Sequence, residues 1–171
     1  MVVRSLRPLP VALVRHLPPV GWWLLKRLPR RASEWFLFKL MGEIYREFSE
    51  PGVELDDDLL AVLVDPAVEW IRPSSFPDSD DYRGHSGVRR EIGEFIENFS
   101  EFRSEVRSVA LDPERETLFV TVKHRGRGVA SGAHTDLDEF HLYRIRHGRV
   151  WRLEMFTDHK AALEARYRQP A

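Results

Sequence analysis

The stretch DPAVEWIRPSSFPDSDDYRGHSGVRREI, residues 65–92, decides the fold. After its opening turn, the apolar and β-branched residues 68–71 predict a short strand. Residues 73–84 are rich in proline, serine and aspartate, which favours an irregular loop. Ser86 can then cap a helix with one apolar face. The sequence therefore predicts a strand, a loop and an amphipathic helix, whose buried residues are Val88, Ile92, Phe95, Ile96 and Phe99.

Upstream of this stretch the sequence predicts two further helices. Ser33 can cap the first, which carries one apolar stripe and ends before Pro51-Gly52. Tyr45 lies beside the stripe, one turn after Met41. Asp56–Asp58 place negative charge at the start of a second, shorter helix.

Downstream the apolar period changes from helical to the two-residue repeat of strands. Alternating residues predict four strands, with a glycine-rich bend at 125–132 and a tight turn at His147-Gly148. A short helix, Lys160–Tyr167, closes the chain. The order of elements predicts an α+β domain in which a curved antiparallel sheet packs against three helices and leaves an internal pocket.

Composition sets outer limits on function. The chain has 171 residues, the size of one domain, and no cysteine, which excludes disulfides and a cysteine nucleophile. The net charge of −1 is unevenly distributed. Residues 1–34 contain seven basic residues and one acidic residue, or +6, while residues 35–171 contain 19 basic and 26 acidic residues, or −7. The acidic domain argues against nucleic acid as a partner.

Residues 1–34 form a basic leader that five prolines interrupt. Its apolar runs are too short for a membrane span or a secretory signal, so we predict a cytoplasmic protein. Trp22 and Trp23 lie near basic residues, which is typical of a peripheral membrane anchor. The alternatives are a poorly ordered extension and a segment upstream of the true start codon.

Residues 65–92, together with FHLYRIRHGRVWRLEMFTDHKAALEA at 140–165, resemble the SnoaL-like branch of the nuclear transport factor 2 (NTF2-like) superfamily. The similarity lies in the DP-x-VEW strand, the loop into YRG-x-x-GVR, and a histidine seven residues before a G-x-V turn. The similarity covers about residues 35–166. It implies an NTF2-like cone that acts without a cofactor and forms a homodimer through the outer face of its sheet. Such cones host isomerases, cyclases, hydrolases and dehydratases as well as non-catalytic binders.

The resemblance also implies positions for catalytic groups. Tyr45 looks like the tyrosine with which ketosteroid isomerases donate to the substrate oxygen, and His141 fits the pocket histidine of polyketide cyclases. The aspartate of the isomerases corresponds to Trp70 here, and that of the cyclases and epoxide hydrolases to Met155. Neither an indole nor a thioether can act as general base.

A shift of one residue would bring Glu69 or Glu154 into those places, but it also turns the side chain to the other face of the sheet unless a bulge intervenes. The candidate catalytic residues are therefore His141 and Tyr45, with Glu154 or Asp136 as the carboxylate.

Four further side chains are expected to line an apolar pocket: Trp70, Phe76, Trp151 and Met155. From these residues we predict cofactor-free acid–base catalysis of the isomerase, cyclase or hydrolase type on a small hydrophobic carbonyl compound. The alternative is a non-catalytic ligand-binding or dimerisation module of the same fold.

The sequence predicts no metal site. His134, Asp136 and Asp138 share one face of a strand, and one histidine with two aspartates suits a hard metal ion only weakly. A solvated strand edge explains the same spacing.

Overall fold

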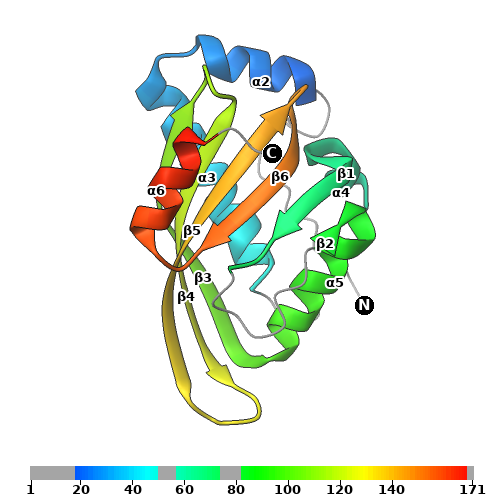
Figure 1. The fold of residues 1–171 in the computed structure, drawn as a ribbon, viewed down its shortest axis with the longest axis vertical. Coiled ribbons are helices and arrows are strands. Elements are labelled where there is room, and N and C mark those ends of the chain that lie inside the picture. The colour runs from blue at the N-terminus through cyan, green and yellow to red at the C-terminus, as the bar shows by residue number, and fades with distance from the viewer. Residues whose placement is uncertain (1–17, 50–56, 74–81, 169–171) are drawn as a thin grey trace.

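The computed structural model describes residues 18–49, 57–73 and 82–168 of the chain (Figure 1). In this part it contains five helices and a six-stranded sheet. In chain order the elements are α2 (Pro18–Arg27), α3 (Arg30–Glu47), α4 (Asp57–Leu63), β1 (Val64–Ile71), β2 (Tyr82–Arg83), α5 (Gly84–Glu97), β3 (Phe99–Asp112), β4 (Thr117–Gly128), β5 (His134–Arg146), β6 (Arg149–Phe156) and α6 (His159–Tyr167).

The strands lie in the order β2-β1-β6-β5-β4-β3 in one curved, unclosed sheet. Strands β3 to β6 form the predicted antiparallel run. Strand β1 pairs parallel with β6, placing Trp70 opposite Leu153, so the sheet is mixed rather than wholly antiparallel. This direction is accessible because α5 and four strands lie between β1 and β6 in the chain, which is ample for a crossover.

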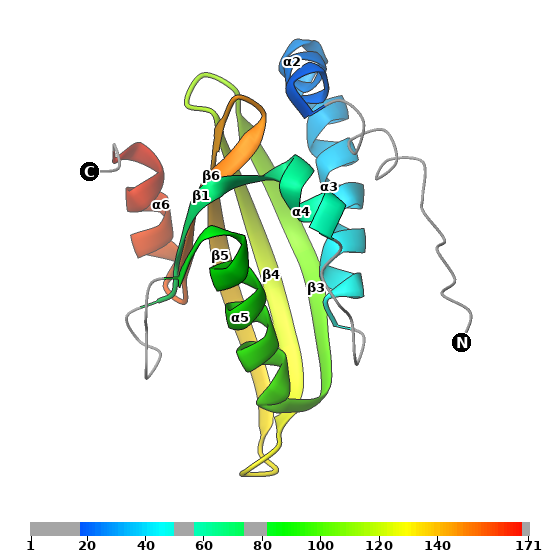
Figure 2. The same cartoon turned by 90° about the vertical axis from the view of Figure 1, so that its right-hand side faces the viewer.

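Helices cover both faces of the sheet. Figure 2 shows the sheet between α6 on one side and α3 on the other. Alternation along β4 assigns side chains to the two faces: Leu118 and Val120 belong to the main core cluster beneath α3, whereas Phe119 packs with Ala162 of α6. The α+β cone predicted from the sequence is confirmed, with α6 covering part of its outer face.

The second half of the leader is helical. Helix α3 begins at Arg30, with Pro29 at its N-cap position, so the prediction that Ser33 caps this helix is wrong. Ser33 is instead fully buried, and its hydroxyl donates to the carbonyl oxygen of Leu25 at 2.7 Å. This bond ties the end of α2 to the first turn of α3. Residues 1–17 lie outside the described part of the chain.

The two adjacent tryptophans of α2 face opposite ways. Trp22 is buried in the main core, while Trp23 is 47% exposed and carries the guanidinium of Arg27 3.7 Å above its ring. Trp35, on the outward side of α3, is 64% exposed. Within the described residues, no helix has both the length and the apolar character needed to cross a membrane.

Half of the glycine-rich segment, residues 125–128, is strand. Strand β4 continues through Gly128, and the connection to β5 covers only residues 129–133. A Cβ at Gly126 would stand 3.0 Å from the ring of Phe99. Glycine at this position therefore lets the aromatic side chains of β3 lie against the backbone of β4.

Candidate functional site

A cavity of about 70 Å³ lies between α3, α5 and the inner face of the sheet. Aromatic and aliphatic side chains form most of its wall, and polar side chains gather at one part of it. We call this cavity the polar chamber. Its polar residues include Tyr45, Glu91, His124, Glu139, His141 and Tyr143.

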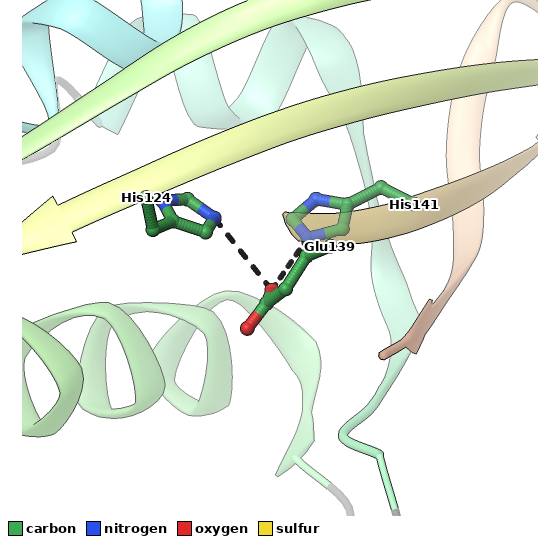
Figure 3. Close-up of side chains that lie close together, drawn as sticks. All are labelled: His124, Glu139 and His141. Carbon is green, nitrogen blue, oxygen red and sulfur yellow. Dashed lines mark hydrogen bonds and ion pairs between the residues drawn. The ribbon is translucent and has the colours of Figure 1, made fainter. Parts of the chain in front are cut away.

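Strand alternation brings the central residues together. Glu139, His141 and Tyr143 are alternate residues of β5 and therefore share its inner face. On β4, Val122 stands opposite Glu139, and His124 follows two residues later on the same face. Figure 3 shows the imidazoles of His124 and His141 converging on the Glu139 carboxylate.

A chain of hydrogen bonds links four of these side chains. The hydroxyls of Tyr143 and Tyr45 are 2.5 Å apart, and the Tyr45 hydroxyl also bonds Nδ1 of His141. Nε2 of His141 lies 2.8 Å from a carboxylate oxygen of Glu139. Because an ionised carboxylate only accepts, Nε2 carries the proton, and Nδ1 accepts from Tyr45. Tyr45 has one proton, so Tyr143 donates to Tyr45.

His124 completes the cluster. Its Nε2 is 3.6 Å from the same oxygen of Glu139 that His141 contacts. Its Nδ1 lies 2.9 Å from the hydroxyl of Ser104. Both histidines therefore have one ring nitrogen held by a hydroxyl and the other turned toward Glu139.

Burial and pairing fix the charges of this cluster. Burial raises the pKa of Glu139, but the hydrogen bonds from His124 and His141 outweigh it and lower the pKa to about 2. Burial lowers the pKa of His141 below its ordinary value, against the opposing effect of Glu139. Burial, with Tyr143 beside it, raises the pKa of Tyr45. At neutral pH the cluster thus holds an ionised carboxylate, a neutral imidazole at His141 and a neutral phenol at Tyr45.

Glu91 is a second carboxyl group in the polar chamber. It lies on α5 and is 5% exposed. Burial raises its pKa to about 7, although the guanidinium of Arg72, 3.6 Å away, favours the ionised form. A carboxyl group that titrates near neutral pH can both accept and return a proton.

The same cluster contains the donor set of a metal site. One ligand atom from each of His124, Glu139 and His141 lies within 4.8 Å of the others. Two imidazoles and a carboxylate suit iron or zinc. The 2.8 Å separation between His141 and Glu139 is that of a hydrogen bond, which satisfies these two groups without an ion.

Four residues predicted from the sequence line the polar chamber. Tyr45 and His141 are in direct contact, and Trp70 and Met155 contribute to the wall. The positions that the resemblance implied for catalytic aspartates therefore do face the cavity, where they carry an indole and a thioether.

Three other predicted residues lie elsewhere. Glu154 points to the outer face, where its carboxylate accepts from Arg144 at 2.8 Å beneath α6. Asp136 is exposed and pairs with Lys123. Trp151 is half-buried beneath the guanidinium of Arg146 and is not among the residues that line the cavity. Phe76 lies outside the described residues.

The alternative carboxylate, Glu69, is also on the outer face. It pairs with Arg152 at 2.5 Å. The register of β1 against β6 shifts between Val64 and Glu69, but this irregularity does not turn Glu69 inward. His134 and Asp138, considered as metal ligands with Asp136, are exposed.

The sequence analysis missed four of the six polar residues named above. Glu139 stands two residues before His141 and Tyr143 two residues after it, so strand alternation alone would have placed both beside the histidine. Continuing the apolar alternation of β4 past Val122 would likewise have found His124. Glu91 gives no comparable signal, because it lies beside the apolar stripe of α5 like any half-exposed helical residue.

Comparison with known proteins shows which family this architecture represents. The model of the SnoaL-like domain matches residues 45–153. The structure is similar to a putative SnoaL-like polyketide cyclase from Jannaschia sp. CCS1, with 18% identity over 84% of this chain and 98% of that chain and a TM-score of 0.58. No curated protein matches the sequence.

Two further structures are similar at the level of the fold. The epoxide hydrolase/cyclase-like enzyme SalBIII, of pyran ring formation in salinomycin, is 11% identical over 71% of this chain and 90% of its own, with a TM-score of 0.54. A putative isomerase from Rhodopseudomonas palustris is 18% identical over 75% of this chain and 93% of its own, with a TM-score of 0.52. With the family match over well over half of the chain, these likenesses identify it as a member of the SnoaL-like domain family, with the NTF2-like fold.

Proposed function

We propose that this protein catalyses proton transfer next to the carbonyl group of a small hydrophobic compound, without a cofactor. The observation that carries the proposal is the buried hydrogen-bond chain from Tyr143 through Tyr45 and His141 to Glu139, facing an apolar cavity. Such a chain offers neutral phenol donors at a desolvated site, where a developing enolate oxygen is strongly stabilised.

Each residue has a distinct task in this proposal. When the ketone binds, the hydroxyl proton of Tyr45 turns from Nδ1 of His141 to the carbonyl oxygen and is donated there as negative charge develops. His141 is a positioning residue, because Glu139 holds its Nε2 proton and leaves Nδ1 to orient the Tyr45 hydroxyl. Tyr143 supplies the second hydroxyl of the pair.

Glu91 is the proton carrier. With a pKa of about 7 it is partly ionised at neutral pH, and its carboxylate can remove a proton from the carbon next to the carbonyl. Returning the proton to the far carbon of a conjugated enolate gives an isomerisation. If Glu91 first exchanges this proton with solvent, return to the original carbon replaces the α-proton by one from solvent. Exchange is therefore the reaction to measure when the natural substrate is unidentified.

The test uses 2-tetralone, an apolar ketone, in D2O, with NMR detection of the loss of its α-proton signals. We expect the protein to accelerate this loss. Glu91→Gln should abolish the acceleration, and Tyr45→Phe should reduce it about 10²-fold, the usual effect of removing one oxyanion donor. His141→Ala should reduce it by no more than Tyr45→Phe does, because His141 acts through the Tyr45 hydroxyl.

Asp136→Asn is the matched control, because it removes an exposed carboxylate that stands outside the cavity. Exchange that is equally fast with Glu91→Gln and with Asp136→Asn would reject Glu91 as the proton carrier. No acceleration across a set of apolar ketones would reject the proposed catalysis altogether.

A non-catalytic ligand-binding or dimerisation module is the second candidate function. Trp70 and Met155 favour it, since they occupy the pocket positions where the resembling enzymes carry aspartates. Binding of apolar ketones without any exchange in wild-type protein would support this candidate.

A further inference from the structure

A second and larger cavity adjoins the polar chamber. Its volume is about 160 Å³, and none of its lining residues in the described part of the chain carries a charge. We call it the apolar chamber. The two chambers share four lining residues, Phe48, Trp70, Ile92 and Tyr143. They therefore meet at the ring of Tyr143, whose hydroxyl belongs to the hydrogen-bond chain of the site.

The leader helix closes the apolar chamber. Gly21, Trp22 and Leu25 of α2 line it. Leu25 follows Gly21 by four residues and Trp22 by three, so it lies beside both on the helix surface. All three precede residues 45–153, the segment that matches the SnoaL-like domain.

We propose that the apolar chamber binds the hydrocarbon part of an elongated neutral ketone whose oxygen lies at Tyr45 and Tyr143. Placement of the oxygen rests on the proposed function, whereas placement of the hydrocarbon rests on the cavity itself. An apolar chain that enters the chamber leaves water for a wall of aliphatic and aromatic carbon, which is favourable for every methylene it buries.

A buried donor at the junction supports a ligand with a polar atom near this point. The indole N–H of Trp70 is buried and has no hydrogen-bond partner among the described residues. Trp70 lines both chambers. A buried unsatisfied N–H is costly, and a ligand oxygen at the junction would remove that cost.

The first experiment measures the affinity of the full chain for unbranched 2-alkanones from 2-hexanone to 2-dodecanone by isothermal titration calorimetry. We expect affinity to rise about fourfold for each methylene that enters the chamber, and then to level off. Affinity that does not depend on chain length would overturn the proposal.

A glycine pair gives matched variants. A Cβ at Gly21 meets nothing within 4 Å, and Gly21 lines the apolar chamber, so Gly21→Leu should fill part of it. Gly42 is also helical with open space at its Cβ, but it lines neither chamber, so Gly42→Leu is the control. We expect Gly21→Leu to remove the advantage of long alkanones and leave 2-hexanone unchanged, and Gly42→Leu to behave as wild type.

A second pair enlarges the chamber instead. Leu25→Ala should move the levelling-off point to longer alkanones, whereas Leu24→Ala, at a neighbouring residue that is 44% exposed and lines neither chamber, should not. The same length dependence in wild type, Gly21→Leu and Leu25→Ala would overturn the proposal. Length-dependent binding without exchange of 2-tetralone would reject only the proposed catalysis, because binding is measured apart from turnover.

Discussion

Replacing Glu91 with glutamine should change how the stability of this protein depends on pH. Glu91 is 5% exposed, and burial raises its pKa from 4.5 to about 7. Between these values the folded state retains a proton that the unfolded state has released. Stability therefore decreases as pH rises through this window, and the contribution of Glu91 is most favourable below pH 4.5.

The magnitude follows from the separation of the two values. The difference of 7 − 4.5 = 2.5 pH units, at about 1.36 kcal/mol per unit, corresponds to about 3 kcal/mol of stability lost above pH 7. Glutamine resembles the protonated carboxyl in size and stays neutral. The Glu91→Gln variant should thus match wild type near pH 4 and be about 3 kcal/mol more stable at pH 8.

The assay is urea unfolding at pH 4 to 9, compared between wild type and variant so that other titrating groups cancel. Glu97→Gln is the control, because it removes an exposed carboxylate at the end of the same helix. A stability difference between wild type and Glu91→Gln that stays constant across this pH range would refute the assignment of Glu91 as a buried carboxyl group that titrates near pH 7.

Three shorter predictions concern the remaining groups. Glu154→Gln should lower the free energy of unfolding by about 2 kcal/mol, because it weakens the hydrogen bond to the buried Arg144. It should leave 2-tetralone exchange unchanged, and a selective loss of exchange would contradict the structural role of Glu154. EDTA should not alter exchange, and activity that disappears with EDTA and returns with a divalent metal would instead assign the His124–Glu139–His141 group to a metal ion. The exposed Trp23 of α2 and Trp35 of α3 are the side chains expected to contact lipid. The Trp23→Ser, Trp35→Ser double variant should therefore co-sediment less than wild type with vesicles containing phosphatidylserine. Equal binding by wild type and variant would reject this membrane contact.

Much of the sheet could be read from the sequence because strands β3 to β6 alternate clearly. The parallel pairing of β1 with β6 could not, since a strand of eight residues has the same pattern in either direction and its partner is about 80 residues away. Helix α2 was not predicted, for another reason. The prolines do divide the leader, since α2 and α3 are separate helices, but Pro18 opens α2 and Pro29 precedes α3, positions where a missing N–H costs nothing.

The site was only half predictable. Tyr45 and His141 follow from one helical position and one strand position that face the same interior. The choice of carboxylate was wrong, because it was sought on β6 and in the exposed half of β5, where Glu154 and Asp136 face arginine and lysine. The burial of Glu91 could not be predicted, because it depends on how α5 tilts against the sheet, and no local sequence pattern specifies that tilt.

The charges of the polar chamber explain why its ligand should be neutral. At pH 7 Glu139 is ionised, Arg72 balances it, and Glu91 is about half ionised, so the sum lies between 0 and −1. A ligand carboxylate would add negative charge beside two desolvated carboxyl groups and would have to compete with Glu91 for Arg72. A ketone brings no charge on binding, and the negative charge on its oxygen appears only during proton transfer, when Glu91 has accepted a proton and the hydroxyl of Tyr45 can donate. The cluster is thus better suited to an oxyanion that forms transiently than to one that arrives with the ligand.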